Sequence, residues 1–184
     1  MNDIALNVGA AEKAIVVRRA TLDDLPALGD LNTEGFSGNK TPGSGERWLR
    51  AYLSCDMFRV WIAEYEGTPA GYIVWQIKGG FNRENPTTEL EQLVVSAAFR
   101  QKGLSRELQE QTLPLVSAWI RETNENAGYM GQIVVWVDAE NEGGLATYAK
   151  RFPKFGGHRC EYIRNGSRLE EVQRKGTMPI PLKQ

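Results

Sequence analysis

One stretch, residues 89–106, restricts the fold of this chain more than any other. It reads E-L-E-Q-L-V-V-S-A-A-F-R-Q-K-G-L-S-R, a strand pattern that passes through a short turn into a helical pattern after Gly103. A strand, a glycine-containing loop and a helix N-terminus together form an anion site, because unpaired N–H groups point outward there and the helix dipole favours negative charge. Gly103 lets a phosphate approach the backbone, and the small Ser105 keeps that approach open.

The composition is that of one ordinary globular domain. The chain has 184 residues, 41% hydrophobic and 24% charged, which is long enough to bury a core without disulfides. Its net charge of −1 argues against binding to DNA or to an anionic membrane through bulk electrostatics, and no apolar run reaches transmembrane length. Two cysteines without CxxC spacing and a single histidine predict no metal site and favour the cytoplasm.

Periodicity and turn signals divide the chain into alternating strands and helices. We expect strands over 15–19, 58–65, 70–77 and 132–138, helices after Thr21, over 46–54 and after Gly103, and a hairpin over 158–172 that turns at Asn165-Gly166. Pro114 should kink or divide the helix that follows Gly103, because it removes one N–H group and clashes one turn back.

Two motifs of this chain resemble those of the GNAT superfamily of N-acetyltransferases. The run from Arg100 through Gly103 to Ser105 is similar to the signature Q/R-x-x-G-x-G/A, with serine at the last position. The run from Asn141 to Tyr148 is similar to N-x-x-A-x-x-L-Y, with Gly144 and Thr147 in the Ala and Leu positions. The strand over 15–19 and the hairpin over 58–77 occur in the same order as in that family.

The resemblance implies an α+β fold of three layers. Its central sheet would be mixed and mostly antiparallel, with about seven strands, helices on both faces, and the fourth and fifth strands splayed apart. The domain would cover residues 15–173, after a flexible lead-in over 1–14 and before a tail over 174–184. Both a monomer and a homodimer stay open.

The resemblance also implies the reaction, transfer of an acetyl group from acetyl-CoA to a primary amine by direct attack in a ternary complex (EC 2.3.1). An amine with a pKa of ~10.4 is free base in only about one molecule in a thousand at neutral pH, so a nearby base is needed. Glu89 and Glu91 lie two apart on the expected strand, hence on one face with Leu93 and Val95. Either glutamate is a candidate base, Glu91 slightly preferred, and the alternative is a pair of solvated carboxylates.

The remaining assignments follow from the family's site. The Leu93 N–H would donate to the oxyanion, the Val95 backbone would bind the pantetheine arm, and N–H groups of 102–106 would bind the pyrophosphate. Tyr148, with a phenol pKa near that of a thiol, would protonate the departing thiolate. The residues expected to bind acetyl-CoA are Leu93, Val94, Val95, Arg100, Gln101, Lys102, Gly103, Leu104, Ser105, Arg106 and Asn141.

Other interpretations remain. The chain could be a GNAT-like module that binds an acyl-CoA or a protein partner without turnover. Residues 38–41, G-N-K-T, superficially resemble a P-loop and would predict ATP binding, but no buried strand precedes them. The acceptor amine, on a small molecule or a protein, is not identified. The glycine-rich loop over 35–45 either covers the acceptor pocket or is simply solvated. Several aromatic side chains could line that pocket or fill the core: Trp48, Tyr52, Trp61, Tyr72 and Trp75.

Overall fold

The computed structural model describes residues 14–36, 43–78, 87–123, 132–135, 137, 141–151, 158–159 and 178–179. The chain divides into two compact units, Met1–Val134 and Val135–Gln184, which are described separately below. In the described part of the chain, no helix combines the length and the apolar character needed to cross a membrane.

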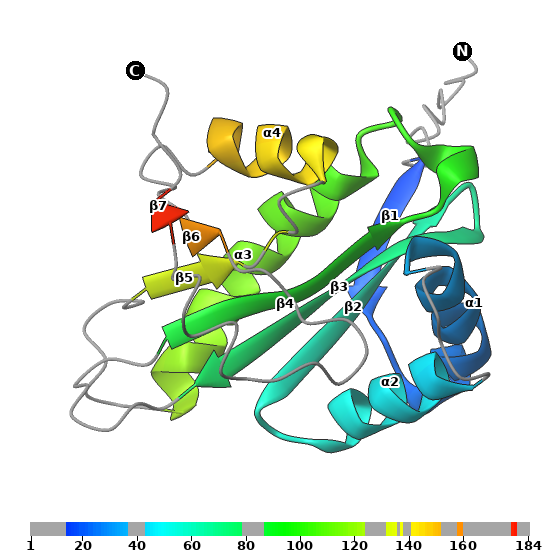
Figure 1. The fold of residues 1–184 in the computed structure, drawn as a ribbon. Coiled ribbons are helices and arrows are strands. Elements are labelled where there is room, and N and C mark those ends of the chain that lie inside the picture. The colour runs from blue at the N-terminus through cyan, green and yellow to red at the C-terminus, as the bar shows by residue number, and fades with distance from the viewer. Residues whose placement is uncertain are drawn as a thin grey trace, which may run out of the picture. The chain divides into compact units, whose positions relative to one another are not determined.

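A five-stranded sheet forms the centre of the first unit, with the strand order β1-β2-β3-β4-β5 (Figure 1). The neighbouring pairs among β1 to β4 are all antiparallel. The strands are β1 (Ile15–Arg19), β2 (Phe58–Tyr65), β3 (Thr68–Lys78), β4 (Thr87–Val95) and β5 (Gln132–Val135). The tight β2–β3 connection at Glu66-Gly67 has positive φ at both residues, 50° and 77°, as a two-residue hairpin turn requires.

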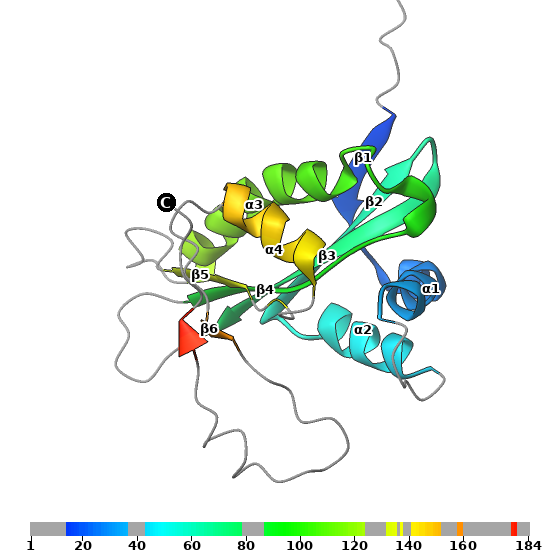
Figure 2. The ribbon, with the colours of Figure 1, turned by 45° about the horizontal axis from the view of Figure 1, so that its top comes forward.

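Two helices, α1 (Leu25–Gly35) and α2 (Ser44–Ser54), cover one face of this sheet and lie beside each other (Figure 2). Leucines at helical spacing on α1 pack with alternate residues of β2 and β3, because a strand presents every second side chain to the same face. The cluster on this face comprises Ala20, Leu25, Leu28, Leu31, Leu49, Tyr52, Val60, Ile62, Tyr72, Val74 and Val94.

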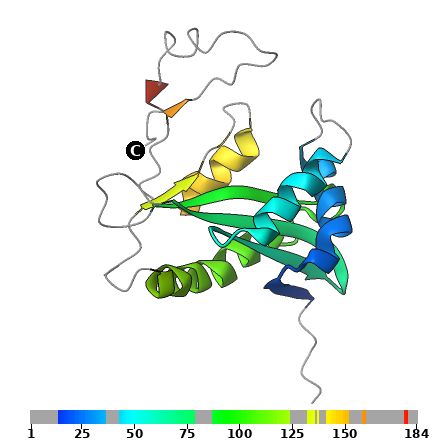
Figure 3. The ribbon, with the colours of Figure 1, turned by 90° about the horizontal axis from the view of Figure 1, so that it is seen from below.

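The helix α3 (Leu104–Thr123) covers the opposite face (Figure 3). Trp75 Nε1 donates a hydrogen bond of 2.9 Å to Thr112 Oγ1, and both side chains are fully buried. Of the two expected effects of Pro114, a division of the helix is wrong, since α3 continues through it without a break, and a kink stays a prediction. Pro114 lies on the exposed side of α3, where water can replace the missing protein hydrogen bond.

The second unit contains the helix α4 (Glu142–Arg151) and a two-stranded pair of β6 (His158–Arg159) and β7 (Met178–Pro179). Asn141 caps α4, because its Oδ1 accepts a 2.9 Å hydrogen bond from Gly144 N. The Asn165-Gly166 turn and the strand expected after it lie outside the described residues. The partner that β6 has in the structure, β7, lies within the range assigned to the tail.

The fold prediction is confirmed in its class and its layers. The described strands β1 to β3 coincide with the expected ones to within two residues, and helices cover both faces. In the described part of the chain, five strands form the sheet, and β6 pairs separately with β7, a strand that was not expected. The seventh expected strand, over 167–172, lies outside the described residues. The splay between β4 and β5 stays a prediction, and β5 has only four residues beside the nine of β4.

Candidate active site

A β-bulge at Glu91 interrupts the regular alternation of β4. On one side of it Val74 pairs with Gln92, and on the other Trp75 pairs with Leu90, so Glu91 is the extra residue. A bulge of this kind re-aims side chains and is common beside active sites. As a result, two successive residues of β4, Glu91 and Gln92, both direct their side chains toward the face that α1 and α2 cover.

The bulge corrects one sequence prediction. Glu89 and Glu91 do share a face, as expected, but Leu93 and Val95 do not lie on it. Leu93 pairs with Ile73, and Ile73 alternates with the residues of β3 that pack under α1 and α2. The extra residue shifts the alternation by one position, so the two apolar side chains belong to the face that α3 covers.

Glu91 lies against the phenol of Tyr52 on α2, whose hydroxyl donates a 3.1 Å hydrogen bond to Glu91 Oε1. Burial raises the pKa of the Glu91 carboxyl above its ordinary value of 4.5, and the neighbouring charge of Glu89 raises this pKa further. The hydrogen bond from Tyr52 and the charge of Lys78 lower it, but the net shift is upward. A carboxylate with a raised pKa is a stronger base than a solvated one.

Glu89 has a different environment. Its side chain is buried and forms an ion pair with Lys78 at the end of β3. The carboxylate of Glu89 is therefore already occupied by a cation of the protein itself. Of the two candidate bases, the geometry therefore favours Glu91.

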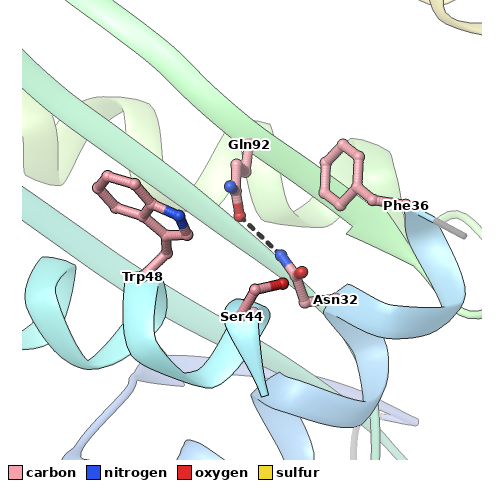
Figure 4. Close-up of a pocket in the computed structure, with 6 residues that line it drawn as sticks. Asn32, Phe36, Ser44, Trp48 and Gln92 are labelled. Carbon is pink, nitrogen blue, oxygen red and sulfur yellow. Dashed lines mark hydrogen bonds between the residues drawn. The ribbon is translucent and has the colours of Figure 1, made fainter. Parts of the chain in front are cut away.

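A cavity of about 290 Å³ opens between α1, α2 and β4. Gln92, the residue that follows Glu91 on β4, lines it. Its lining residues are Asn32, Phe36, Ser44, Gly45, Trp48 and Gln92 (Figure 4). At its floor, the Asn32 amide donates to the Tyr72 hydroxyl at 2.6 Å and to Gln92 Oε1 at 3.2 Å. The Tyr72 hydroxyl in turn donates to Gln92 Oε1 at 2.8 Å. Three residues from α1, β3 and β4 are thereby joined.

The turn between β4 and α3 has the geometry of an anion site. Gly103 has φ of 88°, and a Cβ built there meets no atom within 4 Å, so the space above its backbone is open. The Gly103 carbonyl accepts hydrogen bonds from Arg106 N and Glu107 N, which begins the helix. Residues 102–105 lead into α3, and the first N–H groups of a helix have no intrahelical carbonyl to bond.

The polar side chains around this turn each contact a different partner in the protein. Gln109 donates to Ser105 Oγ at 3.2 Å and to the Ser105 carbonyl at 2.9 Å, so the serine hydroxyl is held at the helix surface. Arg106 is paired with Glu110. Lys102 lies over the ring of Tyr65 at 4.1 Å. Gln101 has φ of 64°, a strained conformation for a residue with a side chain, and such strain occurs often at binding sites.

The hydrogen-bonding pattern between β3 and β4 also fixes the direction in which the backbone N–H and C=O groups of β4 point. Ser96 N donates to the Ala70 carbonyl at 2.9 Å, so the alternation of an antiparallel pair puts Val94 in a hydrogen-bonded position opposite Tyr72. Leu93 and Val95 occupy the alternate positions. Their N–H and C=O groups therefore point away from β3, toward the edge of β4 where β5 lies.

Comparison with known proteins shows the family of this chain. The profile of the Acetyltransferase (GNAT) family matches residues 25–152, which is most of the chain. This chain belongs to the GNAT family of acetyltransferases. No curated protein sequence matches it.

Solved structures of acetyltransferases share its fold. An aminoglycoside acetyltransferase from an uncultured soil metagenomic sample, crystallised with trehalose, is 17% identical with a TM-score of 0.65, over 85% of this chain and 99% of its own. The aminoglycoside N-acetyltransferase AAC(6')-Iy, in complex with CoA, is 18% identical with a TM-score of 0.60, over 82% of this chain and 91% of its own. A ribosomal-protein-alanine N-acetyltransferase from Brucella melitensis biovar Abortus 2308 is 15% identical with a TM-score of 0.63, over 83% of this chain and 100% of its own.

GNAT acetyltransferases use acetyl-CoA, and the turn at Gly103 fits its pyrophosphate. The fit consists of the N–H groups of 102–105, the open space above Gly103 and the exposed cation of Arg100. The Leu93 and Val95 backbone groups point away from β3. The individual binding roles of these residues stay predictions.

Two predicted residues of the GNAT site lie on or beside α4, in the second unit. Burial raises the pKa of the Tyr148 phenol to about 12, so the expectation of a pKa near that of a thiol is wrong. Asn141 has the capping role that asparagine often has, and its role toward the cofactor stays a prediction. Gly144 replaces the usual alanine for a steric reason, since a Cβ there would lie 2.8 Å from Asn141 Nδ2 and 2.9 Å from Val137 Cγ1.

Sequence reasoning missed the amide pair of the cavity floor, Asn32 and Gln92. The signal was weak: Gln92 is a polar residue inside an apolar strand pattern, and Asn32 follows Leu31 on the buried side of α1. Of the five aromatic candidates, Trp48 lines the cavity and Tyr52 contacts Glu91. Trp61, Tyr72 and Trp75 are core residues, although the hydroxyl of Tyr72 joins the amide pair.

Proposed function

We propose that this protein transfers an acetyl group from acetyl-CoA to a primary amine, by direct attack in a ternary complex with Glu91 as the base. The observation that carries the proposal is the bulge of β4, which turns the Glu91 carboxylate toward Tyr52 beside the cavity. A half-buried carboxylate with a raised pKa can take the proton that an ammonium group must lose before it attacks.

The reaction needs three groups besides the substrates. The amine nitrogen attacks the thioester carbonyl carbon, and its proton passes to Glu91 directly or through water. The oxyanion accepts a hydrogen bond from the Leu93 N–H, whose direction away from β3 supports this role. The C–S bond then breaks, and the thiolate of CoA takes a proton to leave as the thiol.

Tyr148 is the candidate donor of that last proton. A phenol with a pKa of about 12 holds its proton throughout the neutral range, as a general acid must. It releases the proton less readily than an ordinary phenol does, so its contribution in this chain is smaller than in a site where the phenol is less buried.

The test of this function combines binding and turnover. Isothermal titration measures the affinity for acetyl-CoA, and a thiol assay measures release of CoA with a panel of amines. Because the similar structures include aminoglycoside and ribosomal-protein-alanine acetyltransferases, the panel includes sisomicin and an alanyl peptide. We expect binding of acetyl-CoA and amine-dependent thiol release. Binding without release on any amine would instead support a non-catalytic acyl-CoA-binding module.

A further inference from the structure

The cavity beside Glu91 has a chemical character that selects among amines. Its described lining consists of two aromatic side chains, two amides, the Ser44 hydroxyl and Gly45, with no acidic or basic side chain among those residues. Two large apolar side chains are exposed at it, Trp48 at 63% and Phe36 at 40%. Exposed aromatic side chains at a cavity mark a surface that binds an apolar ligand.

The hydrogen bonds at the cavity floor orient the Gln92 amide. Its oxygen accepts from both Tyr72 and Asn32, so its nitrogen faces away from them. Figure 4 shows this amide between the rings of Trp48 and Phe36, with the oxygen toward Asn32. Among the described residues, the Gln92 nitrogen has no acceptor, so the floor offers an N–H donor to whatever enters.

The distribution of charge opposes a polycationic acceptor. Glu91 supplies a place for one ammonium group, and Glu89 is already paired with Lys78. A second or third ammonium group in this cavity would lose water without gaining a carboxylate from the described lining, and that loss is costly. The volume of about 290 Å³ is just below the range of roughly 300–1,000 Å³ usual for ligand sites, which also favours a small molecule.

We propose that the acceptor is a small monoamine with an uncharged ring that bears a hydrogen-bond acceptor such as an ether, hydroxyl or carbonyl oxygen. The ring lies against Trp48, the oxygen accepts from the Gln92 amide, and the amine lies at Glu91. This inference rests on the proposed function and adds to it the class of acceptor. It excludes aminoglycosides and linear polyamines as preferred acceptors.

The test compares binding and turnover of matched amines. The ring amines are phenethylamine and para-methoxyphenethylamine, the polycations are sisomicin and spermidine, and an alanyl peptide represents protein N-termini. Binding to the CoA-loaded protein is measured by titration calorimetry, and kcat/KM by thiol release. We expect the methoxy compound to exceed both polycations by about tenfold or more in each measurement. A preference for a polycation or for the peptide would overturn the inference.

Variants of the cavity sharpen this test. Trp48→Ala should raise KM for ring amines about tenfold and leave kcat nearly unchanged, while Trp48→Phe should keep most of the affinity. Gln92→Glu keeps the acceptor for Tyr72 and Asn32 but removes the N–H donor, so it should abolish the preference for the methoxy compound over phenethylamine. Leu115→Ala, an exposed apolar change on α3, is the matched control and should change neither value.

The outcomes separate the two proposals. Ring amines that bind with the expected preference but are not acetylated would contradict the proposed function and leave the selectivity of the cavity standing. Acetylation that proceeds equally well with every amine, and that Trp48→Ala does not alter, would contradict the inference and leave the proposed function standing.

Discussion

The phenol of Tyr52 donates a hydrogen bond of 3.1 Å to the carboxylate of Glu91, across 39 positions of sequence. This contact ties α2 to the bulge of β4, so the helix beside the cavity also orients the candidate base. The hydrogen bond lowers the pKa of Glu91, because a hydrogen bond to a carboxylate favours the ionised form, whereas the charge of Glu89 raises this pKa.

The first prediction concerns the pH dependence of kcat/KM. Activity requires ionised Glu91, so it should rise with pH through the raised pKa of that carboxyl. Tyr52→Phe removes a hydrogen bond that lowers this pKa and should move the acid limb to higher pH. Glu89→Gln removes a charge that raises it and should move the limb to lower pH. Shifts of both variants in one direction would contradict this account of the site.

The second prediction concerns the turn before α3. Gly103 has φ of 88° with open space above it, so Gly103→Ala meets no clash and its cost is backbone strain alone. We expect the free energy of unfolding to fall by about 1–2 kcal/mol, together with weaker binding of acetyl-CoA in titration. Ser105→Ala is the matched variant, and it should keep the affinity because alanine fits the family signature. An unchanged affinity in Gly103→Ala would show that the turn does not hold the pyrophosphate.

The third prediction concerns the start of α4. Asn141→Ala removes the cap and should destabilise the protein by about 1 kcal/mol. Gly144→Ala restores the family's usual residue but places a Cβ 2.8 Å from Asn141 Nδ2, so it should also lower the melting temperature. Because Asn141 makes part of that clash, the double variant should lose less than the sum of the single losses. Additive losses would contradict this packing.

The fourth prediction tests the core on the α3 face. Thr112→Val keeps the shape of the side chain but leaves Trp75 Nε1 without its acceptor in a fully buried place. Chemical denaturation should show a loss of about 1–3 kcal/mol. Exposed Thr68→Val is the control and should change little. A loss in Thr112→Val no larger than in the control would mean that water satisfies the indole.

The elements of the fold were predictable where the local pattern is complete. Residues 15–19 and 58–65 are short runs rich in β-branched and aromatic residues, and the structure has strands with those bounds. The start of α3 after Gly103 followed from the glycine and the helical spacing behind it. These signals are local, so the rest of the chain was not needed to interpret them.

The site was only partly predictable, because its decisive feature depends on strand pairing. A bulge at Glu91 arises from the register between β3 and β4, and no residue of β4 alone marks it. The same holds for Tyr52 and Asn32, which reach β4 from helices far earlier in the chain. The environment of Tyr148 was likewise beyond the sequence, since burial rather than spacing sets its pKa.

The most direct test of the central claim is the transfer rate of Glu91→Gln at saturating acetyl-CoA. If Glu91 is the base, kcat/KM for the amine should fall by about 10²–10⁴-fold at neutral pH. The dissociation constant of acetyl-CoA, measured on the same preparation, should stay within about threefold of the native value, which corresponds to less than 1 kcal/mol. A variant that keeps the native rate with native cofactor affinity would contradict the claim that this carboxylate accepts the proton.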